Sequence, residues 1–112
     1  MKRIEAIVRP NMLEPLKEAL FEAGIAGMSV SEVKGCGNQH GWKEYFRGSE
    51  VFVNTLPKMK FDIVVEDKDV DKLITLIREP ACTGEVGDGK IFVMPVEQVI
   101  RIRTGETGSV AV

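Results

Sequence analysis

The chain contains 112 residues, of which 44% are hydrophobic and 29% charged, with a formal net charge of −2 and a pI of about 5.5. This size and balance predict one folded domain over residues 1–112 with a modest hydrophobic core. The slightly acidic composition argues against a surface that binds nucleic acid or anionic lipid. No apolar run is long enough to span a membrane, and the opening "MKR" leads into a strand pattern rather than a signal peptide, so we expect a cytoplasmic protein.

Residue types that bind metals or carry out nucleophilic catalysis are scarce. Cys36 and Cys82 belong to no C-x-x-C pair and are expected to be free thiols in a reducing compartment. His40 has no cysteine cluster beside it, which argues against a structural zinc site. No serine or cysteine stands beside a recognisable base, so the sequence predicts neither a catalytic triad nor a Cys–His pair.

One structural unit occurs twice along the chain. The segments "RIEAIVRP", from Arg3, and "KFDIVVED", from Lys60, each contain a basic residue, an apolar one, an acid and three small or branched apolar residues. Apolar residues three and four apart follow each segment and predict the buried stripe of an amphipathic helix. The stripe positions are Leu13, Leu16 and Leu20 in the first unit and Val70, Leu73 and Ile77 in the second.

Residue type also predicts where these helices begin and end. Asn11 and Asp67 precede the apolar stripes and are suitable N-caps, because their side chains can accept hydrogen bonds from the first free N–H groups. Gly24 and Pro80 come near the other ends, where such residues stop helices.

A second strand follows each predicted helix, as "GMSVSEVKG" over residues 27–35 and as "KIFVMPVEQVIRI" over residues 90–102. Two strand–helix–strand units in one sheet predict an α+β, ferredoxin-like βαββαβ sandwich with both helices on one face. The other face is expected to carry Ile7 and Val64, and the last strand is apolar on both sides. Because such a strand is normally buried on both sides, we expect another copy of the chain to cover this face.

A glycine-rich loop over residues 82–90 has the composition of a phosphate site. In "TGEVGDGKIFV", Gly87 and Gly89 allow backbone N–H groups to converge on one anion, and Lys90 adds a positive charge. The order differs from that of a P-loop, because a strand rather than a helix follows the glycines.

Two arginines further along the chain strengthen this interpretation. Arg101 and Arg103 lie two residues apart on the predicted strand, so their guanidinium groups would share one face and suit a polyphosphate. The alternative is a glycine hairpin with a solvated lysine, followed by arginines on an exposed edge strand. The loop and the arginines together on one strand favour phosphate.

The stretch over residues 37–57 shows no periodicity, and irregular segments of this length are usually functional or disordered. It carries arginine and glycine at Arg47 and Gly48, together with aromatic residues, as interaction surfaces do. The aromatic residues are Trp42, Tyr45, Phe46 and Phe52. Local packing of these rings is the alternative, and we favour a mobile loop that binds a partner.

These motifs resemble those of the PII nitrogen-regulatory signal-transduction proteins. The resemblance rests on "TGEVGDGKIFV", "IRIRTGE", "GMSVSEVKGCGNQ" and "RGSE", and runs from Met1 to about Gly105. It implies a non-enzymatic homotrimer that binds ATP or ADP in the clefts between subunits and 2-oxoglutarate beside Mg-ATP. Such proteins act on ammonium transporters, nitrogen-regulatory enzymes or transcription factors, through a long loop here spanning residues 37–57.

The resemblance also implies roles for individual residues. The nucleotide-binding positions are Ile7, Ser29, Gly37, Asn38, Asp62, Val64, Gly87, Asp88, Gly89, Lys90, Arg101 and Arg103. The 2-oxoglutarate positions are Gln39, Lys58 and Gly87, with Gln39 as the Mg²⁺ ligand together with the ATP phosphates. The partner-binding positions are Phe46, Arg47 and Gly48, and residues 101–112 form a C-terminal loop.

The chain departs from the family pattern at several of these positions. Phe46 and Val51 stand where tyrosines are usual, so the common acceptor of uridylyl or adenylyl groups is absent, while Ser49 is a less favoured modification site. Asn38 and His40 replace common basic residues, which puts one contact to the phosphates in doubt. Cys36 replaces an aromatic residue and Asp62 a glutamate, changes that could alter affinity for the base.

Three functions fit the sequence: a non-enzymatic sensor of nucleotide and 2-oxoglutarate, a sensor of adenine nucleotides alone, and a phosphoryl-transfer enzyme or ATPase. The enzyme is disfavoured because no general base or water-positioning group stands near Lys90. Gln39 and Lys58 argue against the sensor of nucleotides alone, whereas Asn38 and His40 keep it open.

Overall fold

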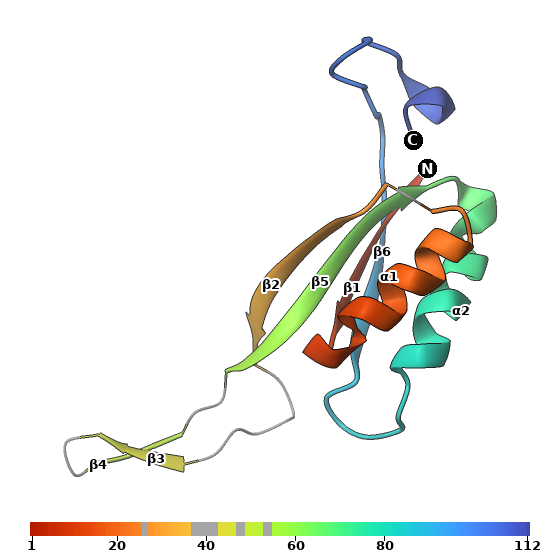
Figure 1. Ribbon diagram of the computed structural model, residues 1–112. Helices are drawn as coiled ribbons and strands as arrows, with labels where there is room; N and C mark the ends of the chain where they lie inside the picture. The colour runs from red at the N-terminus through yellow and green to blue at the C-terminus, as the bar shows by residue number, and fades with distance from the viewer. Residues whose placement is uncertain (26, 37–42, 47–48, 53–54) are drawn as a thin grey trace.

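A computed structural model describes residues 1–25, 27–36, 43–46, 49–52 and 55–112. The main sheet has four antiparallel strands in the order β2-β5-β1-β6. Its strands are β1 (Lys2–Val8), β2 (Ser29–Gly35), β5 (Leu56–Val65) and β6 (Gly89–Pro95), and its helices are α1 (Leu13–Glu22) and α2 (Val70–Ala81). Both helices lie on the same face of this sheet (Figure 1). This is the ferredoxin-like α+β arrangement that the repeated unit predicts, and that prediction is confirmed.

Alternation along the two central strands decides which face the helices cover. The side chains that point towards the helices are apolar and buried, and they form the core with the helical stripes. These core residues are Ile4, Ala6, Val8, Leu16, Leu20, Met59, Phe61, Ile63, Val65, Leu73, Ile77 and Ala81. The residues between them, including Ile7 and Val64, point to the other face and are partly exposed. The predicted division of each strand is therefore confirmed, and the open face is uncovered in this chain.

The predicted N-caps are wrong. Each helix is preceded by a 3-10 turn, Pro10–Met12 before α1 and Asp67–Asp69 before α2, so the α-helices begin later than predicted. Asn11 and Asp67 lie inside these turns, and neither helix has a side-chain N-cap hydrogen bond. The carboxylate of Asp67 instead accepts a hydrogen bond from the amino group of Met1 at 2.9 Å.

The C-terminal ends of the helices agree with their sequence signals. Gly24 follows α1 with a φ of 84°, a conformation that glycine adopts without strain. The next N–H, that of Ile25, then donates to the carbonyl of Leu20 at 2.9 Å. Pro80 is the penultimate residue of α2, which ends one residue later.

Strand β6 ends much earlier than predicted. Its last residue, Pro95, lies opposite Lys2, the first residue of β1, so the ladder ends there. The following segment is not an extended strand: Ile100 and Thr107 form an isolated bridge around a turn, and a 3-10 helix spans Gly108–Ala111. The sequence alternation in "VEQVIRI" therefore misled the prediction, since no neighbouring strand continues beside it.

The stretch over residues 37–57 is not wholly irregular, which corrects a second prediction. Strands β3 (Lys43–Phe46) and β4 (Ser49–Phe52) form a separate antiparallel pair, and Leu56 already belongs to β5. Because Phe46 lies opposite Ser49, only two residues connect the strands. Two β-prone runs separated by two residues that include a glycine are a hairpin signal.

Candidate functional site

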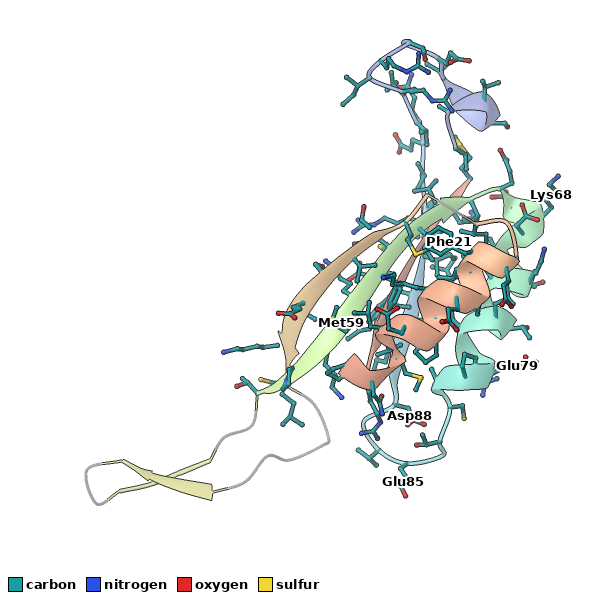
Figure 2. The ribbon with its side chains drawn as sticks, in the orientation of Figure 1. Phe21, Met59, Lys68, Glu79, Glu85 and Asp88 are labelled. Atoms are coloured by element: carbon teal, nitrogen blue, oxygen red, sulfur yellow. The ribbon has the colours of Figure 1, made fainter. Side chains whose placement is uncertain are left out.

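The segment between α2 and β6 is a loop that its own acidic residue closes. The carboxylate of Asp88 accepts hydrogen bonds from the backbone N–H groups of Thr83 at 2.8 Å and Gly84 at 3.0 Å, and from the Thr83 hydroxyl at 2.5 Å. These hydrogen bonds lower the pKa of Asp88 to about 2, with the Thr83 hydroxyl as the largest cause. Asp88 is therefore ionised at neutral pH, with its charge directed at the beginning of the loop. In Figure 2, Glu85 lies at the tip of this loop and Asp88 nearer the helices.

The two glycines that flank Asp88 give the loop its shape. Gly87 and Gly89 have φ values of 105° and 107°, which other residues rarely adopt. A Cβ atom on Gly89 would also lie 1.8 Å from the carbonyl oxygen of Ile7, so only glycine allows β6 to pair with β1 here. The N–H groups of Gly87 and Asp88 have no acceptor within the described part of the chain. Consecutive unpaired N–H groups of this kind are what an anion-binding nest requires.

Two cations approach the loop from the sheet. Lys58, on β5, donates from Nζ to the carbonyl of Gly87 at 2.9 Å, and Arg9, directly after β1, donates to the carbonyl of Val86 at 2.9 Å. The pKa of Lys58 is lowered by burial first and by the nearby Arg9 charge second, while the Asp88 charge raises it. The structure thus brings together two predicted positions, Lys58 and Gly87. It adds Arg9, which sequence reasoning missed although it stands in the repeated segment "RIEAIVRP".

The residues predicted to surround adenine share the open face of the sheet. Asp62 lies opposite Ser29 on β2 and opposite Glu5 on β1, and Val64 is two residues further along β5. Ile7 lies on the same face of β1. The Arg3 guanidinium donates to one oxygen of Asp62 at 2.7 and 3.0 Å, so this carboxylate is oriented from within the sheet.

The arginines do not meet the loop, which contradicts the prediction that they follow it on one strand. The glycine loop precedes Gly89, whereas the arginines follow Pro95, at the other end of β6 and roughly 20 Å away. Figure 1 shows the two segments at opposite ends of the sheet. Arg101 is instead bound within its own segment, to Glu106 at 3.1 Å and to the carbonyl of Val110 at 2.8 Å. Arg103 lies in the adjacent turn and is exposed.

A family model described as "Nitrogen regulatory protein P-II" matches residues 1–106. The chain belongs to the P-II family. It is 57% identical to proteins of that name from Microchaete diplosiphon and Nostoc punctiforme, and 54% identical to the one from Azospirillum brasilense. Each similarity extends over 112 residues and covers 100% of both chains. P-II proteins are signalling proteins of nitrogen regulation and are generally not enzymes.

Several predicted positions of this P-II chain lie outside the described residues. They are Gly37, Asn38, Gln39, His40, Arg47 and Gly48. Phe46, Ser49 and Val51 lie on the strands of the hairpin, where the backbone alone is described. The described part of the site therefore consists of the glycine loop with its two cations and of the open sheet face.

A cavity of about 380 Å³ between α2 and β6 adjoins the loop of this P-II chain at Gly89 and Lys90. Its walls include Ile77, Ile91 and Val93, which lie on the helix side of the sheet. The predicted adenine positions are on the opposite face, so this cavity is not the predicted nucleotide surface. Among the described residues, no helix is long and apolar enough to cross a membrane.

Proposed function

We propose that this P-II chain binds ATP or ADP and 2-oxoglutarate without catalysing a reaction, and signals through residues 37–57 to a nitrogen-metabolism partner. The observation that carries the proposal is the contact between Lys58 and Gly87, at 2.9 Å. It joins a carboxylate-binding candidate on β5 to the glycine loop predicted to hold phosphate. A movement of the glycine loop can therefore change the binding of both the nucleotide and 2-oxoglutarate.

The nucleotide would lie along the open face, with its phosphates at the glycine loop. Gly87 and Asp88 offer unpaired N–H groups, and Lys90 lies on the same face because its register partner is Ile7. Arg101 and Arg103 cannot reach this loop in their own chain, so we propose that they come from a second copy. A homotrimer with the open faces turned inward would supply them at each of three clefts.

The 2-oxoglutarate dianion would bind where two cations already approach each other. Lys58 and Arg9 lie close enough for the Arg9 charge to lower the Lys58 pKa, and an added carboxylate would relieve that repulsion. The basic groups and loop N–H donors fit an anion on chemical grounds. Gln39 would hold Mg²⁺ with the ATP phosphates, and the metal would neutralise phosphate charge beside the second anion.

Calorimetric titration with ATP, ADP, and Mg-ATP plus 2-oxoglutarate tests the proposal. We expect ATP and ADP to compete for one site per chain, and 2-oxoglutarate to bind only when Mg-ATP is present. Nucleotide binding without any 2-oxoglutarate response would identify a sensor of nucleotides alone. Steady release of ADP and phosphate from ATP would identify an enzyme and overturn the proposal.

Assembly can be tested independently by light scattering. We expect the mass of a trimer at micromolar concentration, because the open face carries the apolar residues Ile7, Val64 and Phe92. The side chain of Phe92 is 45% exposed in the single chain. A monomer would remove the source of the arginines, and with it the proposed nucleotide cleft.

An ammonium transporter is the proposed partner, with a nitrogen-metabolism enzyme or transcription factor as the alternative. In the sequence, Arg47 and Gly48 stand between the residues of β3 and β4, and an arginine that becomes buried in a partner can dominate an interface. Val51 carries no hydroxyl, so ligands rather than a covalent group at that position would control release.

A pull-down of the cell's ammonium transporter from membranes tests this partner. The parent chain should bind with ADP and dissociate with Mg-ATP plus 2-oxoglutarate, whereas Arg47→Ala should not bind. Binding that ignores both the substitution and the ligands would exclude this mechanism.

A further inference from the structure

We propose that the side chain of Asp88 is a positioning group for the phosphate loop rather than a ligand of the nucleotide. Its carboxylate, with Thr83 and Arg9 as partners, holds the loop in the shape that presents the N–H groups of Gly87 and Asp88. This inference rests on the proposed function, since it concerns how the same loop is prepared for a polyphosphate.

An acidic residue in a phosphate loop presents an electrostatic problem. A carboxylate a few ångströms from a polyphosphate repels it, and this effect is strong where water is partly excluded. Asp88 is only 22% exposed, so its charge must be compensated by the protein. A site that binds phosphate can therefore contain Asp88 only if hydrogen-bond donors and cations of the protein compensate its negative charge.

The structure shows that compensation in detail. Oδ2 of Asp88 accepts from the N–H groups of Thr83 and Gly84, while Oδ1 accepts from the Thr83 hydroxyl. The Arg9 guanidinium approaches Oδ1 at 3.5 Å through both Nε and Nη2. Each carboxylate oxygen is thus occupied by groups of the same chain, at the beginning of the loop and at the end of β1.

The same contacts close the loop into a ring. The Thr83 hydroxyl also accepts a hydrogen bond from the N–H of Glu85 at 3.2 Å, which orders the first turn. Arg9 donates to the carbonyl of Val86, which ties the middle of the loop to β1. With its side chain directed at residues 83 and 84, Asp88 leaves its own N–H and that of Gly87 without an acceptor among the described residues. The contacts at residues 83 and 84 therefore compensate the Asp88 carboxylate, while the N–H groups of Gly87 and Asp88 stay available for an anion.

The experiment compares two acids of the same loop. Asp88→Ala removes the carboxylate that closes the ring, whereas Glu85→Ala removes one at the exposed tip and serves as the matched control. Thr83→Val removes the hydroxyl at nearly constant shape, and Thr83→Ser restores it. Each variant is titrated calorimetrically with ATP and with adenosine, which lacks phosphates, and its unfolding midpoint is recorded.

We expect Asp88→Ala to weaken ATP binding at least about tenfold, the scale of a lost charge-assisted hydrogen bond, with adenosine affinity unchanged. Thr83→Val should weaken ATP binding several-fold, and Thr83→Ser should bind like the parent. Glu85→Ala should bind ATP as well as the parent or slightly better, because a remote negative charge is removed.

Two results would overturn the positioning role while the proposed function stands. One is an Asp88→Ala variant that binds ATP as well as Glu85→Ala does, since the carboxylate would then merely repel phosphate. The other is an equal loss of ATP and adenosine affinity with a lowered midpoint, which would indicate general structural damage. If the parent chain binds ATP no more tightly than adenosine, the proposed phosphate loop is wrong, and the positioning role of Asp88 is wrong with it.

Discussion

The covered and open faces of the sheet are built from the same strands but carry opposite chemistry. On the covered face, the buried side chains of β1 and β5 are all apolar and none is more than 8% exposed: Ile4, Ala6, Val8, Met59, Phe61, Ile63 and Val65. On the open face, the same two strands present Arg3, Glu5, Lys58, Lys60 and Asp62, interrupted by Ile7 and Val64. Adjacent residues of one strand therefore serve different purposes. The covered face supplies the free energy of folding, and the open face supplies charges and hydrogen-bonding groups for recognition.

The largest effect is expected on the free energy of unfolding, when two neighbouring residues of β5 that point to opposite faces are each replaced. Phe61→Ala should lower the free energy of unfolding by about 3–5 kcal/mol, because Phe61 is 0% exposed and its removal leaves a cavity in the core. Chemical denaturation monitored by circular dichroism measures the loss. Lys60→Ala is the matched control on the open face and should change the free energy of unfolding little. Equal losses in the two variants would show that the open face also supports folding.

The next effect concerns ligand affinity and not stability. Lys90→Ala and Arg103→Ala should each weaken ATP binding by about 1.5–3 kcal/mol, the scale of a hydrogen bond to a charged group. Both residues are exposed, so the unfolding midpoint without ligand should barely change. Calorimetry and thermal denaturation of the same samples separate the two quantities. If both variants bind ATP like the parent, neither side chain contacts phosphate.

A smaller effect should appear on acidification. The pKa of Asp88 is about 2 in the folded chain, below its ordinary value of 3.8, so its carboxylate stabilises the fold above about pH 4. That stabilisation is lost as the pH falls from 4 towards 2, because over this range the unfolded chain binds a proton at Asp88 that the folded chain does not. We expect Asp88→Asn to unfold at a lower temperature than the parent at pH 7, with the difference shrinking towards pH 2. A difference independent of pH would mean that the charge of Asp88 contributes nothing.

The smallest effect is expected at the open-face ion pair. Arg3 and Asp62 are 2.7 Å apart, but the Arg3 side chain is 43% exposed, and such pairs contribute little to stability in water. Arg3→Gln should leave the unfolding midpoint nearly unchanged while altering ATP affinity through the orientation of Asp62. Thermal denaturation with and without ATP measures both, and a large loss of stability without ligand would contradict the division between the faces.

Sequence alone predicted the elements whose pattern reflects burial. Alternation in "RIEAIV" and "KFDIVV" predicted the strands, and spacing at Leu16, Leu20, Leu73 and Ile77 predicted the buried helix stripes. These signals are reliable because one side of each element faces the core. Residues near the helix starts were harder to interpret, since Asn11 and Asp67 suit a 3-10 turn as well as an N-cap.

The parts that failed depend on contacts between distant residues. The arginines were predicted on a continuation of β6 because alternation persists past Pro95, yet a strand needs a partner and β1 begins opposite that proline. Arg9 was missed because nothing local marks it, and its role arises where the end of β1 meets residues 86 and 88. The strand pair β3–β4 was not predicted because each strand has only four residues, too few to show a clear alternation of apolar and polar side chains.

The central position of β1 also has a consequence for synthesis. This first strand lies between β5 and β6, with Lys2 opposite both Val65 and Pro95, so its two partners are the last strands of the sheet to be made. Pairings between residues so far apart in sequence close slowly, because a long loop must be ordered before the contacts form. A growing chain that ends before Gly89 has nothing to pair with the second edge of β1, and unpaired edges promote association between chains. Completion of the sheet therefore awaits release of nearly the whole chain from the ribosome.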